Sequence, residues 1–185
     1  KNMQNANLPG FDFGYANIQY GKFKGANLRG AYFNNATITG ANFDGADLRL
    51  ANFANARRHI FYAVFNRADL SRSHLQGTHF DASDFIDAKL VKANIKRSNI
   101  ARASLTGADF SQANLEDASI RICNLSGADL GKANLRNCKF YRCNLRGANF
   151  KDAILKGTFF DESEYDDTTI WPDNFKPERR KAVKI

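Results

Sequence analysis

The sequence lacks the features that would place a chain in or across a membrane. No stretch approaches the roughly 18 consecutive apolar residues that a transmembrane helix needs, and no basic segment followed by an apolar one opens the chain. Hydrophobic residues make up 43% of the sequence and charged residues 25%, as in ordinary globular domains. We therefore expect a folded, soluble chain without a targeting segment, and its compartment stays open.

The sequence also lacks any set of residues that would form a catalytic centre. No nucleophile, base and orienting group occur together at a recognisable spacing. Serine, threonine, histidine and aspartate are spread along the chain as parts of a repeating pattern. We therefore predict that the protein is not an enzyme, and we expect no cofactor.

What the sequence has instead is a period of five residues. A large apolar residue returns every fifth position, and a small residue, mostly Ala, stands two places before it, as in Ala26-Asn27-Leu28-Arg29-Gly30. A helix would bring apolar residues back at steps of three and four, and a strand at steps of two. The pattern therefore requires a chain that turns once per repeat, with one large and one small side chain inward and three outward.

A second period shows how many repeats close one coil. From Leu8 to Phe53 the large residues read Leu, Phe, Ile, Phe and then repeat that order, so residue type returns every 20 positions. Four repeats therefore make one turn. Between Phe53 and Phe65 the spacing slips by two residues, within positions 54–63, and we interpret the slip as an insertion at one corner. From Phe65 the period runs on to Tyr165 and Ile170.

This repeat resembles that of the pentapeptide-repeat family, whose motif is Ala, then Asp or Asn, then Leu or Phe, then two variable residues. The resemblance covers about residues 3 to 170. It implies an all-β fold, a right-handed quadrilateral parallel β-helix of about eight coils. We expect this β-helix to occupy residues 1–170, and residues 171–185 to form a C-terminal cap and basic tail.

The composition changes where the repeat stops. We expect Trp171 and Phe175 to fold over the last coil as a cap, because an open end would leave backbone edges and apolar side chains exposed. Pro177 to Lys184 is predicted as a short helix, with proline in its first turn. No comparable segment covers the first coil. That favours either a missing upstream segment or a homodimer through the N-terminal end.

Cysteine and histidine are scarce, with three of each. All three cysteines, Cys123, Cys138 and Cys143, stand at the small inward position, so we expect buried thiols that act as small apolar residues.

His59 and His79 would share one outward face, with Asp81 close to His79 and His74 on the next face. Zinc needs three or four convergent ligands, whereas the corners of a convex rod diverge. We therefore predict no metal site.

The slip itself is the first candidate interaction site. It joins cations and aromatic residues on what we expect to be a protruding loop, and loops on a rigid scaffold often carry recognition. The alternative is that the same side chains pack on the outside of the coil. The candidate loop consists of Arg57, Arg58, His59, Phe61 and Tyr62.

The second candidate is a basic surface, suggested by a formal net charge of +8. Folded into the square, these cations spread over several faces, and the alternative is an ordinary solvated surface. The candidate residues are Lys89, Lys92, Lys96, Arg97, Arg102, Arg136, Arg142 and Arg146.

The function we expect is a non-enzymatic protein–protein interaction or scaffolding module, because the regularity serves the scaffold and variation is confined to its outside. The first alternative is a binder of an anionic partner, nucleic acid or a membrane surface, through the basic faces. The family resemblance implies another: some members mimic DNA and occupy type II topoisomerases. That role needs an acidic rod, and this chain is basic.

Overall fold

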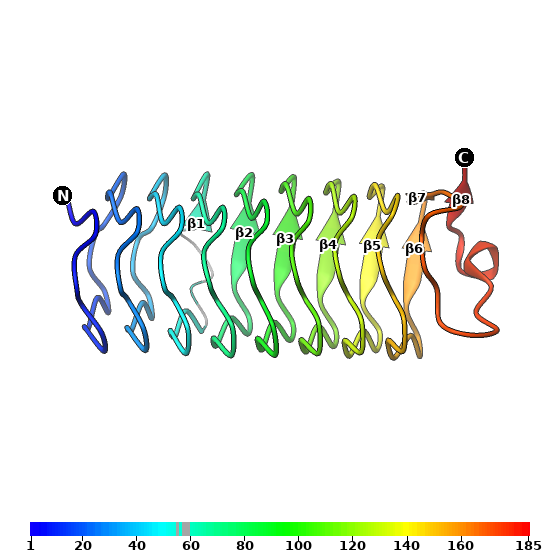
Figure 1. Ribbon diagram of the computed structural model, residues 1–185, viewed down its shortest axis with the longest axis horizontal. Coiled ribbons are helices and arrows are strands. Elements are labelled where there is room, and N and C mark those ends of the chain that lie inside the picture. The colour runs from blue at the N-terminus through cyan, green and yellow to red at the C-terminus, as the bar shows by residue number, and fades with distance from the viewer. Residues whose placement is uncertain (55, 57–59) are drawn as a thin grey trace.

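A computed structural model describes residues 1–54, 56 and 60–185. The chain is a straight rod of stacked coils, with its N-terminus at one end and its C-terminus at the other (Figure 1). The fold is a right-handed quadrilateral parallel β-helix, as predicted. Successive coils lie side by side because each one pairs its backbone with the next.

The main sheet runs along one face of the rod and has six short parallel strands in sequence order. From Ile60↔Phe80 to Phe140↔Phe160, the paired residues of neighbouring strands are separated by four repeats, so each of these coils is four repeats long. The strands are β1 (Ile60–Phe61), β2 (His79–Asp81), β3 (Asn99–Ala101), β4 (Ser119–Arg121), β5 (Lys139–Tyr141) and β6 (Phe159–Asp161).

The first coils pair through isolated parallel bridges rather than through strands. Bridges recur at four places in a coil, which gives the rod four faces. In the first coil these bridges are Asn2↔Lys22, Asn7↔Asn27, Asp12↔Tyr32 and Asn17↔Thr37. Six coils contribute a strand to the main sheet, and the coils before them pair through bridges alone. The number of coils differs slightly from the eight or so predicted from the length of the repeat.

The slip changes the register of the bridges. Asn42 pairs with Val64, which lies two positions beyond the regular partner, whereas Val64 pairs with Asp84 at the regular spacing of four repeats. The columns of side chains therefore continue across the insertion. Within 54–63, Asn55, Arg57, Arg58 and His59 lie outside the described residues.

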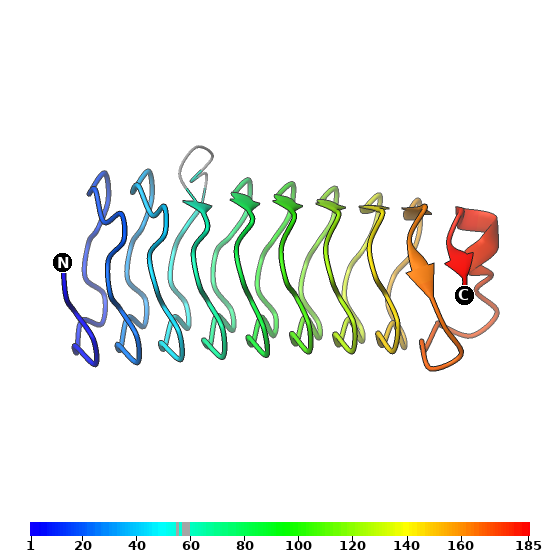
Figure 2. The same ribbon diagram turned by 90° about the horizontal axis from the view of Figure 1, so that it is seen from above.

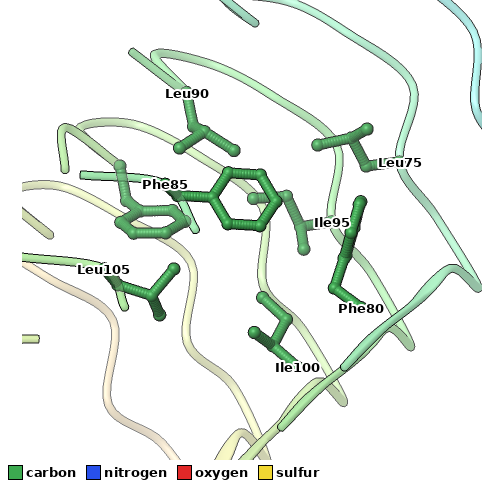
Figure 3. Close-up of a pocket in the computed structure, with 8 residues that line it drawn as sticks. Leu75, Phe80, Phe85, Leu90, Ile95, Ile100 and Leu105 are labelled. Atoms are coloured by element: carbon green, nitrogen blue, oxygen red, sulfur yellow. The ribbon is translucent and has the colours of Figure 1, made fainter. Parts of the chain in front are cut away.

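The core consists of columns of large apolar side chains along the rod axis. Phe23, Phe43, Phe65 and Phe85 form one such column, with ring centroids of neighbours 4.8 to 5.1 Å apart and nearly parallel planes. Figure 3 shows the interior between Leu75 and Leu105, where side chains from all sides meet at the axis. The space that these residues enclose has no volume for a water molecule. The interior of this part of the rod therefore cannot hold a ligand.

The corners depend on residues with positive φ. The second residue after each large inward one, here called the corner residue, adopts the left-handed conformation in coil after coil. Glycine adopts it readily, as at Gly30, but Leu50 and Ile122 adopt it too. The Asn or Asp before the large residue supports the turn. Asp109 Oδ1, for example, accepts a hydrogen bond from the backbone N–H of Ser111 at 2.9 Å.

The end of the repeat differs from the prediction. Ile170, expected as a large inward residue, is 50% exposed, and it pairs with Asn149 one position beyond the regular spacing. One extra residue at the corner formed by Asp166, Asp167 and Thr168 shifts the chain. Thr169 then takes the small inward position, where its hydroxyl donates to the Leu145 carbonyl at 3.0 Å. Trp171 takes the large inward position in place of Ile170.

The C-terminal segment lies across the end of the rod beyond β6 (Figure 2). The predicted helix from Pro177 to Lys184 is wrong in extent, because only η1 (Pro177–Arg180) is helical, as a single 3-10 turn. Lys181 then adopts positive φ, and β8 (Val183–Lys184) pairs in parallel with β7 (Glu164–Tyr165). The last coil offers a free backbone edge, and the tail fills it with a strand.

Candidate interaction surfaces

The candidate loop at the slip is described only in part. Phe61 ends β1, and Tyr62 is the corner residue that follows it, with φ 56° and 67% of its surface exposed. Arg57, Arg58 and His59 lie outside the described residues. The two aromatic residues of the candidate loop therefore lie at the edge of the main sheet.

Further apolar side chains are exposed along the same side of the rod. We call this side the strand face and define it as the outward residues of β1–β6 with the corner residue after each strand. Phe61, Tyr62, Ile122 and Phe159 are exposed there. Tyr141, the last residue of β5, is half-buried, and the guanidinium of Arg142 lies 5.1 Å from the centre of its ring. The strand face thus combines apolar and aromatic groups with ion pairs such as Arg142–Glu162.

Most of the candidate basic surface is neutralised by neighbouring carboxylates. Five of its eight cations are in ion pairs with an acid of an adjacent coil. Only three, Lys89, Lys92 and Arg136, are in no ion pair with a described residue. The pairs are Lys96–Glu116 at 2.9 Å, Arg97–Asp117 at 3.8 Å, Arg102–Asp81, Arg142–Glu162 at 2.6 Å and Arg146–Glu164 at 2.8 Å.

The remaining three cations do not share one face. Lys89 and Lys92 flank Leu90 in one repeat, and the backbone of Lys89 pairs with those of Asp69 and Asp109. Arg136 stands at a different face, where its side chain reaches Asn134 Oδ1 at 3.5 Å. The structure therefore does not bring the predicted basic residues into one continuous patch.

An ion-pair cluster that the sequence did not reveal spans the coils on both sides of the slip. Asp44 is buried, and its carboxylate accepts three hydrogen bonds from the guanidinium of Arg67 at 2.6 to 3.1 Å. Lys24 lies 3.3 Å from the same carboxylate. The hydrogen bonds from Arg67 hold the pKa of Asp44 below its ordinary value. These three side chains connect three consecutive coils.

The cysteines are buried and free, as expected from their inward position. Cys123 and Cys143 lie one coil apart, and their thiols reach the carbonyls of Ile100 at 3.6 Å and Ile120 at 3.4 Å. Burial raises the pKa of Cys138, which keeps its sulfur as an unreactive thiol. Among residues 1–54, 56 and 60–185, no three His, Cys, Asp or Glu side chains gather as metal ligands would.

The cap residues meet the last coil through their rings. Trp171 stacks on Phe150, with ring centroids 4.6 Å apart and planes within 5°, and Phe175 lies 5.3 Å beyond Trp171. Tyr165 donates a hydrogen bond to the carboxylate of Glu178 in η1. Burial, together with that carboxylate, raises the pKa of Tyr165 to about 12. The tail is thus joined to the last coil by stacking, by this hydrogen bond and by β7–β8 pairing.

Comparison with known protein families gives the same repeat. The family model described as "Pentapeptide repeats (8 copies)" matches residues 2–35, 22–55 and 63–100, and the model "Pentapeptide repeat region" matches residues 93–170. The chain belongs to the pentapeptide-repeat family. No curated protein sequence matches it.

Solved structures of pentapeptide-repeat proteins have similar folds. The protein alr5209 from Nostoc PCC 7120 is 30% identical, with 70% of this chain and 87% of that chain covered and a TM-score of 0.47. Full-length QnrB1, a plasmid-mediated fluoroquinolone resistance protein, is 15% identical, with 97% and 91% covered and a TM-score of 0.57. At that identity the likeness to QnrB1 shows the fold alone.

This pentapeptide-repeat protein has no described helix with the length and apolar character to cross a membrane. Membership of the family accounts for the inward columns, which repeat in every coil. It does not account for the outward residues, because the motif leaves those positions variable. The strand face and the ion-paired surfaces are therefore properties of this particular chain.

Proposed function

We propose that this pentapeptide-repeat protein is a non-enzymatic module that binds another protein through its strand face. The observation that carries the proposal is that Phe61, Tyr62, Ile122 and Phe159 are all exposed on that one face, in the coils of β1, β4 and β6. Single exposed apolar residues are common on protein surfaces, but several along one rigid face are typical of an interaction site. A long, flat partner surface would fit such a face.

The chemistry of the strand face agrees with a protein partner. Aromatic residues and arginine are enriched at the centres of protein–protein interfaces. The strand face offers Phe61, Tyr62 and Tyr141 beside Arg121 and Arg142. Backbone pairing between coils fixes these residues in place, so binding would cost little conformational entropy.

Ile122 gives a further reason. A β-branched residue with φ 56° is strained, by about 1–2 kcal/mol relative to a residue suited to the left-handed conformation. Gly40 fills the same corner position nearer the N-terminal end of the rod, so the fold accepts glycine there. An exposed isoleucine at this corner lowers stability, which supports a role in contact with a partner.

The absence of room in the core supports a role that does not involve catalysis. The interior around residues 75–110 is filled by its own side chains, so a substrate would have to bind outside. The anionic alternative loses support from the five ion pairs, because each neutralises a cation that nucleic acid or an anionic membrane would need.

The test is capture of a partner by the purified rod from its native lysate at low salt. The informative variant is Tyr62→Asp with Ile122→Asp, which places two charges on the strand face without changing the corner conformation. The matched control is Ile86→Asp with Ile154→Asp, two exposed apolar residues on other faces. We expect the captured protein to be lost with the first pair and retained with the second.

Loss of capture with both pairs, or with neither, would contradict the assignment to the strand face. Capture that falls steeply between 50 and 200 mM salt, together with retention of random duplex DNA, would favour the anionic alternative instead. Urea unfolding of each variant confirms that the rod is intact.

A further inference from the structure

A second surface lies two faces away from the strand face. A pocket of about 220 Å³ is lined by Arg29, Arg49, Leu50, Ser71 and Arg72. Three consecutive coils form it, because Asn27, Asp47 and Asp69 pair in one column and the lining residues follow them in the chain. None of these residues was a candidate in the sequence.

The corner residues beside the pocket differ from coil to coil. Gly30 stands at the corner beside Arg29, and a Cβ atom added to it would meet nothing within 4 Å. In the next coil the same corner holds Leu50, which is 42% exposed and has φ 62°. In the coil after that the corner residue is Arg72, so Leu50 and Arg72 line the pocket from two neighbouring corners.

The charges in the pocket are not fully balanced. Arg49 donates two hydrogen bonds to Asp47, at 2.8 and 2.5 Å, and lies 3.9 Å from Asp69. Arg29 and Arg72 are exposed, and neither is in an ion pair with a residue that the structure describes. The pocket therefore presents two guanidinium groups that no described carboxylate holds in an ion pair, next to a third that is already paired.

We propose that this pocket binds the phosphate monoester of a phosphorylated segment of the protein partner. The inference rests on the proposed function, since it names a chemical feature of that partner. A phosphate monoester carries a charge of about −1.5 to −2 at pH 7, which matches the two arginines outside ion pairs. Guanidinium groups bind phosphate oxygens through paired hydrogen bonds, and the hydroxyl of Ser71 adds another donor.

The surroundings favour a peptide over nucleic acid. Asp47 and Asp69 flank the pocket, and a long polyanion lying along the rod would meet both carboxylates. The volume suits one anionic group rather than a phosphate backbone. Leu50 forms an apolar wall for a side chain next to the phosphorylated residue. A single phosphate within a peptide satisfies all three conditions.

The experiment is a titration of the ¹⁵N-labelled chain followed by two-dimensional NMR. The probes are inorganic phosphate, the blocked peptide Gly-Leu-phosphoserine-Leu-Gly and the same peptide without phosphate. We expect saturable shifts of the Leu50, Ser71 and Arg72 amides with phosphate, tighter binding of the phosphopeptide and no saturable shift with the unphosphorylated peptide. Arg29→Gln with Arg72→Gln should weaken binding by about tenfold or more, because charged hydrogen bonds are lost.

The matched control is Arg136→Gln with Lys156→Gln, which removes the same charge from another face and should leave binding unchanged. The proposal is overturned if the shifts do not saturate, or if both double variants weaken binding equally. Tighter binding of a thymidine oligonucleotide than of the phosphopeptide would also overturn it. If phosphate and the phosphopeptide cause no saturable shifts while the rod still captures a partner through its strand face, this inference alone is rejected. If they cause saturable shifts but the rod captures no partner, the proposed function is rejected.

Discussion

The inward and the outward columns of the rod differ in how much the residue varies from coil to coil. Inward, Phe23, Phe43, Phe65 and Phe85 repeat one side chain through four coils. Outward, the corner column of the strand face changes chemistry at nearly every coil. Inward side chains must fill the same volume each time, whereas outward ones need only tolerate the turn and water. The information that distinguishes this chain therefore lies outside. The outward column reads Tyr62, Ala82, Arg102, Ile122, Arg142 and Glu162.

The largest expected effect is that of breaking an inward column. Phe43 is fully buried and stacks on both neighbours, so Phe43→Ala should lower the free energy of unfolding by about 4 kcal/mol. The matched outward change is Tyr15→Ala, which removes a ring that is 83% exposed and should cost about 0.5 kcal/mol or less. Urea unfolding measures both. Equal losses would remove the distinction between inside and outside.

The cap should come next in size. Trp171→Ala removes the ring that stacks on Phe150 and should cost about 3 kcal/mol, with amide exchange becoming faster first in residues 160–185. Trp171→Phe should cost much less, because the indole nitrogen is buried without a hydrogen-bond partner among the described groups. If exchange rose evenly along the whole rod, the C-terminal segment would not be acting as a local cap.

The ion-pair cluster at the slip should give a smaller, pH-dependent effect. Hydrogen bonds from Arg67 lower the pKa of Asp44 in the folded chain. The stabilisation is therefore fully present above the pKa that Asp44 has when unfolded, and it is lost as the pH falls through the lower folded value. Between pH 6 and pH 3, the urea midpoint of Asp44→Asn should fall less than that of the unchanged chain. A parallel fall in both would show that Asp44 does not contribute.

The smallest expected effect has the opposite sign. Ile122→Asn relieves a strained corner and should raise the free energy of unfolding by about 1 kcal/mol, because asparagine tolerates positive φ. Ile86 is exposed without positive φ, so Ile86→Asn should give no gain. The stabilised Ile122→Asn rod should nevertheless bind its partner more weakly. A variant that is both more stable and fully active would argue against a role for Ile122 in binding.

The sequence predicted the inward columns well, because a period of five has few physical solutions. The slip was also visible, since the large residues return in register after Phe65. The end of the repeat was mispredicted: Tyr165 and Ile170 keep the spacing of five, yet one added residue at the corner between them turns Ile170 outward. Spacing alone does not show where a corner has lengthened. The strand β8 was missed because its pairing depends on the free edge of the last coil.

The surfaces were less predictable than the columns, although part of the signal was present. Lys96 and Glu116 are separated by one full coil of the sequence, as are Arg142 and Glu162, so the stacking period places each pair in contact. That rule would have removed both cations from the basic surface. It does not reveal Asp44 with Arg67, because the slip makes their separation longer than one regular coil. Nor does it reveal the arginine pocket, which is lined by residues of three coils.

The most direct test of the account is amide exchange of the rod alone and in complex with the protein that it captures. The account predicts that the partner slows exchange in the peptides that contain Tyr62, Ile122 and Tyr141. These residues belong to different coils and share only the strand face. Protection confined to the other three faces, with the strand face exchanging as in the free rod, would contradict it.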